Sequence, residues 1–192
     1  MLITFARTNK LSRPPTEGMP KMTGNDIITR VRNAKATFGP KCRKFTGAAT
    51  VEILRNALAA ESIPTSARDV FVRGVPLEID LIVPRPGSTK PHFGLLYEPR
   101  SVAVALEIKN SGCFGQDSLR RVTSNLKQLR NAGIRCAYVT LEERRGYRWT
   151  ATSKRLGTRC FTLAWHTTTD GPYKMTSDWC ALLKYLRKTL KG

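Results

Sequence analysis

Residues 101–109 read SVAVALEIK, a nearly continuous apolar run that ends on charged side chains. Such a run, without regular alternation of apolar and polar residues, is typical of a strand that is buried on both faces at the centre of an α/β sheet. A strand of this kind needs a covering layer on each side. The chain has 192 residues, enough for one domain with a full hydrophobic core, and we expect a single domain over residues 23–192.

Segments of alternating type surround this strand. A Thr-x-x-Asp capping pattern that begins at Thr23 predicts one helix, and apolar residues at helical spacing predict others over residues 48–61 and 117–132. An amphipathic helix is expected to close the chain. The further strands are expected over residues 70–73, 77–83, 134–141, 147–150 and 159–166. This order predicts an α/β fold with a central mixed β-sheet flanked by helices, followed by extra C-terminal strands and a helix.

Two segments do not fit any period. Residues 1–22 mix charges with two adjacent prolines, and we expect a mobile arm there. Residues 84–100 contain four prolines and two glycines, so we expect an excursion outside the core.

The net charge of the chain limits the classes of partner that it is expected to bind. The chain has 33 Lys and Arg but only 14 Asp and Glu, which gives a formal net charge of +19. Its content of 41% hydrophobic residues argues against disorder. The positive electrostatic field of such a chain favours binding to a polyanion. Nucleic acid is the leading candidate, before an anionic membrane or an acidic protein. No apolar stretch reaches the ~18 residues of a membrane span, and no secretory signal is evident, so we expect a cytoplasmic protein. Five scattered cysteines without a CxxC pair argue against a structural zinc site or a disulfide framework.

Acidic residues interrupt the apolar strands. Glu78 and Asp80 lie two residues apart in one strand, and Glu107 and Lys109 do so in the next, so each pair shares a face of its strand. Charges in such surroundings need partners or a metal ion.

The pairing register decides which of these groups meet. With Val83 opposite Val102, Asp80 would face Ala105 and Glu78 would face Glu107. A slightly shifted register places Asp80 beside Glu107 instead. In both registers we expect three carboxylates and one lysine to converge.

Two interpretations of this convergence stay open. Two or three carboxylate oxygens form the incomplete set of hard ligands that Mg²⁺ accepts when a phosphate supplies the rest, and Lys109 would lie close to the attacking water. Alternatively, Lys109 only neutralises Glu107 or Asp80 in a structural ion pair.

The segments GVPLEIDLIV and VALEIKNSG resemble the PD-(D/E)XK nuclease superfamily, and in pattern they come closest to archaeal Holliday-junction resolvases and small bacterial YraN-type proteins. The resemblance spans about residues 47–141 and implies a restriction-endonuclease-like core. It implies that Asp80 and Glu107 bind the metal together with the backbone carbonyl of Ile108, and that Lys109 is catalytic. Glu52, five residues after Gly47, matches a further catalytic acid of many members; an ordinary solvated glutamate is the equal alternative.

The resemblance implies a Mg²⁺-dependent endonuclease that hydrolyses DNA, with Mn²⁺ as a substitute metal. Its substrate could be a branched junction, a defined sequence or DNA ends, and a homodimer would suit either of the first two because two strands must be cut symmetrically. The alternatives are a basic nucleic-acid-binding protein without catalysis and a restriction-like domain that has lost its activity.

Basic residues outside the strands are the expected contacts to DNA phosphates. Residues 84–100 could reach DNA that flanks the cut, or could form an insertion that packs on the edge of the domain. The residues expected to contact DNA are Lys90, Arg100, Arg120, Arg121, Lys127, Arg144, Arg145 and Arg148.

Overall fold

A five-stranded mixed sheet lies at the centre of the computed structural model, which describes residues 20–39, 42–110, 116–144, 156–168 and 171–192. In spatial order its strands are β3 (Leu81–Pro84), β5 (Val102–Lys109), β6 (Cys136–Arg144), β7 (Arg159–His166) and β8 (Tyr173–Met175). The pairs β5–β6 and β6–β7 are parallel, whereas β3 and β8 run antiparallel to their neighbours. The predicted α/β class with a mixed sheet is confirmed, and β5 is a buried central strand as expected.

A second, three-stranded sheet was not foreseen. It consists of β1 (Val70–Val72), β2 (Val75–Ile79) and β4 (Leu96–Tyr97), in the order β2-β1-β4. The single strand expected over residues 77–83 is therefore wrong, because its first half belongs to this small sheet and its second half to the central one. The expectation that residues 84–100 contribute nothing to the core is also wrong, since Tyr97 in β4 is buried.

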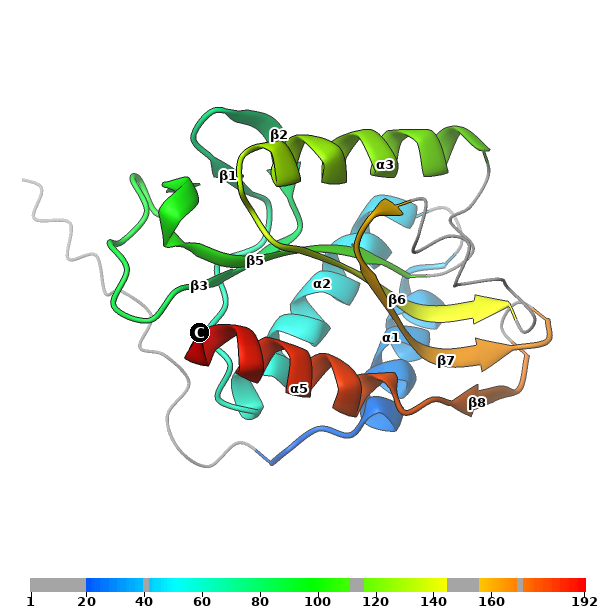
Figure 1. The fold of residues 1–192 in the computed structure, drawn as a ribbon. Coiled ribbons are helices and arrows are strands. Elements are labelled where there is room, and N and C mark those ends of the chain that lie inside the picture. Colours follow the sequence, from blue (N-terminus) through cyan, green and yellow to red (C-terminus); the bar gives the residue numbers. More distant parts are fainter. Residues whose placement is uncertain (1–19, 40–41, 111–115, 145–155, 169–170) are drawn as a thin grey trace, which may run out of the picture.

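Helices cover both faces of the central sheet (Figure 1). On one face lie α1 (Gly24–Phe38), α2 (Arg43–Ala60) and α5 (Asp178–Lys191). On the other face lies α3 (Gln116–Asn131) together with the small sheet. A short 3-10 helix, η1 (Pro99–Ser101), leads into β5. Within the described parts of the chain, no helix is long and apolar enough to cross a membrane.

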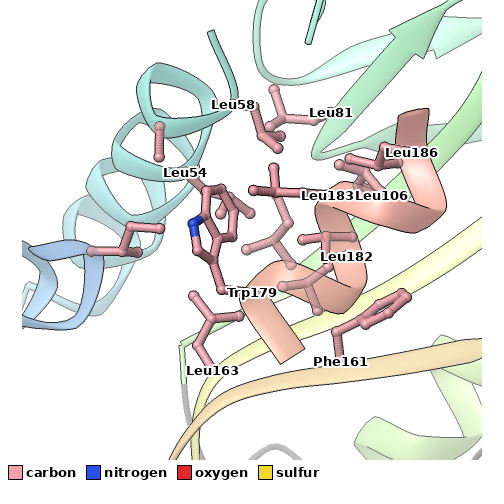
Figure 2. Packing of buried hydrophobic residues seen from close by; sticks show 14 of the residues in the cluster. Leu54, Leu58, Leu81, Leu106, Phe161, Leu163, Trp179, Leu182, Leu183 and Leu186 are labelled. Carbon is pink, nitrogen blue, oxygen red and sulfur yellow. The ribbon is translucent and has the colours of Figure 1, made fainter. Parts of the chain in front are cut away.

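The larger core cluster joins the α1, α2 and α5 layer to the sheet. Figure 2 shows Trp179 and Leu182 of α5 packed among leucines of α2 and the central strands. The indole N–H of Trp179 donates a hydrogen bond to the carbonyl of Met22 (3.2 Å), and Met22 is itself buried. Residues 1–19 of the expected arm lie outside the described residues.

The observed starts of the helices can be compared with those that the sequence predicts. Thr23 and Asp26 form the expected capping box at the start of α1. The second helix begins at Arg43, five residues before its expected start, so it takes up part of the connection. β8 was not expected, and the strand expected over residues 147–150 lies outside the described residues.

Candidate functional site

Asp80 is the single residue between two strands that belong to different sheets. β2 ends at Ile79 and pairs with β1, whereas β3 begins at Leu81 and pairs with β5. The backbone carbonyl of Asp80 still accepts a hydrogen bond from the N–H of Asp69 (3.4 Å), just before β1. The apolar residues on either side of Asp80 are buried in their sheets, which fixes the carboxylate at this change of partner.

The strand register brings Asp80 to Glu107. Leu81 pairs with Leu106 and Ile82 with Ala105, so continuing the antiparallel ladder by one residue places Asp80 opposite Glu107. The shifted register considered from the sequence is thus the observed one. The carboxylate of Asp80 reaches across the end of the ladder and accepts a hydrogen bond from the backbone N–H of Ile108 (2.6 Å).

These side chains point to the face of the sheet that carries α3. Ile82 and Ala105 pack in the cluster formed by α3 and the small sheet. Side chains of a strand alternate between faces, so Glu107 and Lys109 share the face of Ala105 and open toward α3. Any ligand of these groups must therefore approach from the α3 face.

Lys109 lies between the two carboxylates. Its Nζ is 2.5 Å from Glu107 Oε1 and 3.7 Å from Asp80 Oδ2. The exposed fractions of the side chains are 29% for Lys109, 25% for Asp80 and 13% for Glu107, so a ligand from solvent can reach the cluster. The structure brings together Asp80, Glu107 and Lys109 as predicted from their spacing in the strands.

Burial dominates the titration of Asp80. Loss of hydration raises the pKa of this carboxyl from 3.8 to about 6, against the opposing effect of Lys109. The neighbouring charge of Glu107 raises the pKa further, and the hydrogen bond from Ile108 lowers it. An acid that is costly to ionise here would gain from a cation placed between it and Glu107.

Glu78 does not join this cluster. It lies in β2, in the small sheet, and its side chain is exposed. The expected convergence of three carboxylates is therefore wrong, because the chain changes sheets between Glu78 and the carboxylate pair. Within the described residues, no three histidine, cysteine or acidic side chains gather closely enough to hold a metal ion.

Asp69 is an acid near the cluster that sequence reasoning missed. Its charge contributes to the raised pKa of Asp80. Val70 pairs with Ile79 in the β1–β2 hairpin, and extending this register by one residue places Asp69 opposite Asp80. The register shift between Val70 and Val72 brings it there, whereas the pairing of Val72 with Val75 alone would place Asp69 opposite Glu78, so no signal in the sequence marked it.

Glu52 is engaged elsewhere on its own helix. Its carboxylate accepts two hydrogen bonds from the guanidinium of Arg55, one of them 2.9 Å long, and its side chain is 42% exposed. These hydrogen bonds lower the pKa of Glu52. This local geometry is that of a solvated glutamate paired with Arg55, the second of the two alternatives. The catalytic role of Glu52 stays a prediction.

The residues of the cluster fit a hard cation with few protein ligands. In a β-strand the N–H and C=O of one residue point to the same side, so the carbonyl of Ile108 faces the edge where its N–H meets Asp80. β3 starts only at Leu81, so the ladder has ended opposite this carbonyl. Two carboxylates and one carbonyl form the partial oxygen set that Mg²⁺ accepts when water and phosphate complete its shell.

The described residues expected to contact DNA are all exposed. Arg120, Arg121 and Lys127 lie on α3, and Arg144 ends β6. Lys90 and Arg100 flank β4, in the segment that packs against β1. Arg145 and Arg148 lie outside the described residues.

A buried ion pair was also missed. Arg32 of α1 donates two hydrogen bonds to Glu142 in β6 (2.7 and 2.9 Å), and the side chain of Glu142 is 2% exposed. The guanidinium also stacks on the ring of Tyr173 in β8, 4.4 Å from its centre. Two successive glutamates within the long apolar strand β6 were the available signal.

No protein-family model matches the chain, and a comparison with curated proteins finds no match.

Proposed function

We propose that this protein is a Mg²⁺-dependent endonuclease that hydrolyses DNA phosphodiester bonds. The observation that carries the proposal is the meeting of Asp80, Glu107 and Lys109 at the end of β5, in a chain with a net charge of +19. Lys109 offsets only one of the two carboxylate charges, so the cluster opposes the binding of a polyanion unless a further cation is bound.

Each residue has a distinct proposed role. Asp80 and Glu107, with the carbonyl of Ile108, would hold Mg²⁺, whose charge offsets the negative charge that builds up on the phosphate during attack. Lys109 would orient the attacking water and stabilise the same charge, because its ammonium is within reach of both carboxylates. The side chain of Glu52, paired with Arg55, lies outside this minimal set.

The sequence resemblance to the PD-(D/E)XK nuclease superfamily supports the proposal. The order of helix, hairpin, buried strand, helix and strand is compatible with a restriction-endonuclease-like core. The acids occupy the strand ends in the pattern that this resemblance implies.

A nicking assay with matched variants tests the proposal. We expect the wild-type protein to relax or linearise plasmid DNA in Mg²⁺ or Mn²⁺ and to be inactive in EDTA. Asp80→Asn, Glu107→Gln and Lys109→Met should each lower the cleavage rate by about 100-fold or more, the loss typical of removing one electrostatic stabiliser. Glu78→Gln is the control, since this exposed acid lies two residues from Asp80 but outside the cluster.

The competing function is nucleic-acid binding without catalysis. Tight DNA binding without cleavage in any divalent metal would favour it, with Lys109 serving only as the counter-ion of the two acids. Cleavage that persists in all three cluster variants would instead exclude this site as the source of the activity.

A further inference from the structure

Phe93 is the most exposed large apolar side chain among the described residues. Its side chain is fully exposed (100%), whereas the next such residues, Phe45 and Leu95, are 55% and 44% exposed. Full exposure of a phenyl ring gives up the free energy that burial would supply. The position also strains the backbone, because Phe93 has φ +54°, a left-handed conformation that a bulky residue rarely adopts.

The turn that carries Phe93 is well braced. The N–H of His92 donates to the carbonyl of Leu96 (2.9 Å), and the N–H groups of Leu95 and Leu96 donate back to the carbonyl of His92 (3.1 and 3.0 Å). Next to the turn, Glu98 accepts a hydrogen bond from Arg73 of the β1–β2 turn (2.7 Å). The backbone beneath the ring is thus fixed, so binding costs little in ordering of the loop.

The turn lies on the face used by the candidate site. Tyr97 of β4 packs in the same cluster as the α3 leucines, and this is the face to which Glu107 and Lys109 point. The surrounding segment is basic: residues 84–100 carry Arg85, Lys90 and Arg100 against a single acid, Glu98. A polyanion bound over the α3 face would therefore meet cations beside this ring.

We propose that Phe93 stacks on a nucleobase of the bound DNA. A ring can stack only on a base whose face is uncovered, so the substrate would contain a duplex end, a branch point or a single-stranded segment. This inference rests on the proposed function and narrows it to DNA with an exposed base. Leu96 pairs with Phe71, two residues from Asp69, and Asp69 lies opposite Asp80. Two strand spacings and two residues of rise therefore place this turn roughly 10–15 Å from Asp80, so the stacked base lies a few nucleotides from the cut.

Binding in Ca²⁺ tests the inference with three labelled DNAs of equal length. These are a covalently closed double-stranded minicircle, which has neither ends nor loops, a linear duplex with a single-stranded overhang, and a four-way junction. We expect Phe93→Ala to weaken binding to the overhang and the junction by about 5- to 150-fold relative to the closed duplex, the range that stacking of one base supplies. Phe93→Trp should restore binding, and Phe45→Ala, on the opposite face, should have no effect.

Two further readouts separate stacking from other roles of the ring. A 2-aminopurine placed at the unpaired position should change its fluorescence with wild-type protein and not with Phe93→Ala. The slope of log affinity against log salt should not change, because no charge is lost. Phe93→Gly should raise Tm by about 2–4 °C while it weakens binding, since glycine relieves the left-handed strain.

The failures are distinguishable. If the wild-type protein cuts DNA in Mg²⁺ and Phe93→Ala binds and cuts all three DNAs equally well, the stacking is wrong and the nuclease proposal stands. If Phe93→Ala reduces binding to anionic phospholipid vesicles and not to DNA, the ring serves a membrane and the stacking is again wrong. If the wild-type protein neither binds nor cuts any of the DNAs, both proposals fail.

Discussion

At the scale of single residues, the ionised carboxylate of Asp80 is needed for the proposed function but lowers the stability of the fold. Its carboxyl group is held where ionisation is costly, which raises its pKa to about 6. A raised pKa means that the folded state binds the proton more tightly than the unfolded state does. The stability that comes from protonated Asp80 is complete below its ordinary pKa of 3.8, and it is lost as the pH rises through about 6.

We therefore expect Asp80→Asn to stabilise the metal-free protein at neutral pH. The gain at pH 7.5 should be roughly 1–3 kcal/mol, the upper end being the equivalent of moving the pKa from 3.8 to about 6. The difference should shrink as the pH falls and disappear below about pH 4. Urea unfolding of both proteins at several pH values measures it, with Glu78→Gln as the control for loss of an exposed acid. Equal stability of the wild-type protein and Asp80→Asn at pH 7.5 would show that Asp80 is not strained.

Mg²⁺ should reverse this order. Binding to the folded wild-type protein adds stability that grows with metal concentration, whereas Asp80→Asn has lost a ligand and should gain little. Thermal unfolding in 0 and 10 mM Mg²⁺ provides a readout that does not depend on cleavage. A Tm that rises equally in both proteins would place the metal elsewhere.

The sequence indicated the acids of the site because charges inside apolar strands are conspicuous. Asp80, Glu107 and Lys109 could be predicted from alternation alone, once the strands were assumed to pair. The sequence could not show that Glu78 lies outside the cluster and Asp69 lies near it. Their positions depend on the residue at which the chain passes from the small sheet to the central one. No local signal marks that change, since Leu77 to Val83 is uniformly rich in strand-forming residues.

At the scale of elements, the buried pair of Arg32 and Glu142 ties α1 to the end of β6. The bond is bidentate, and the Arg32 side chain is 21% exposed against 2% for Glu142. A buried ion pair of this kind adds little over an apolar pair of equal size, but removing one partner leaves an uncompensated charge. The pair therefore fixes how α1 docks on β6 and adds little to the total free energy of unfolding.

We expect Arg32→Met to destabilise the protein by about 3–5 kcal/mol, the typical cost of stranding a buried charge. The double variant Arg32→Met/Glu142→Leu should recover most of this loss. Arg187→Met removes the more exposed pair with Glu61 and should cost less than about 1 kcal/mol, which makes it the matched control. Chemical unfolding measures all three. A double variant as unstable as Arg32→Met alone would mean that the arginine acts through other contacts, such as its stacking on Tyr173.

The elements themselves were the most predictable part of the fold. Capping residues and apolar periodicity gave α1, α3 and α5, because these signals are local. The short strands β4 and β8 were missed for the opposite reason. Their pairing with β1 and β7 depends on contacts between segments far apart in the chain, and two or three residues are too few to show a period.

At the scale of the whole molecule, the net charge of +19 does not by itself say which face would bind the proposed DNA substrate. Exposed cations lie on both covering layers, with Arg120 and Arg121 on α3 and Lys184 and Lys188 on α5. The two helices lie on opposite faces of the sheet (Figure 1). Only the α3 face carries Glu107 and Lys109, so a nuclease must bind DNA there, whereas binding by diffuse charge would use both faces.

Two double variants that each remove two positive charges separate these cases. We expect Arg120→Ala/Arg121→Ala to lower the magnitude of the slope of log affinity against log salt by about 1.8, or 0.9 for each phosphate that the protein no longer neutralises. Lys184→Ala/Lys188→Ala should leave both affinity and slope nearly unchanged. Fluorescence anisotropy in Ca²⁺ between 50 and 200 mM KCl measures both quantities. If the two double variants weaken binding equally, the charge acts diffusely, and the acidic cluster no longer identifies the face to which DNA binds.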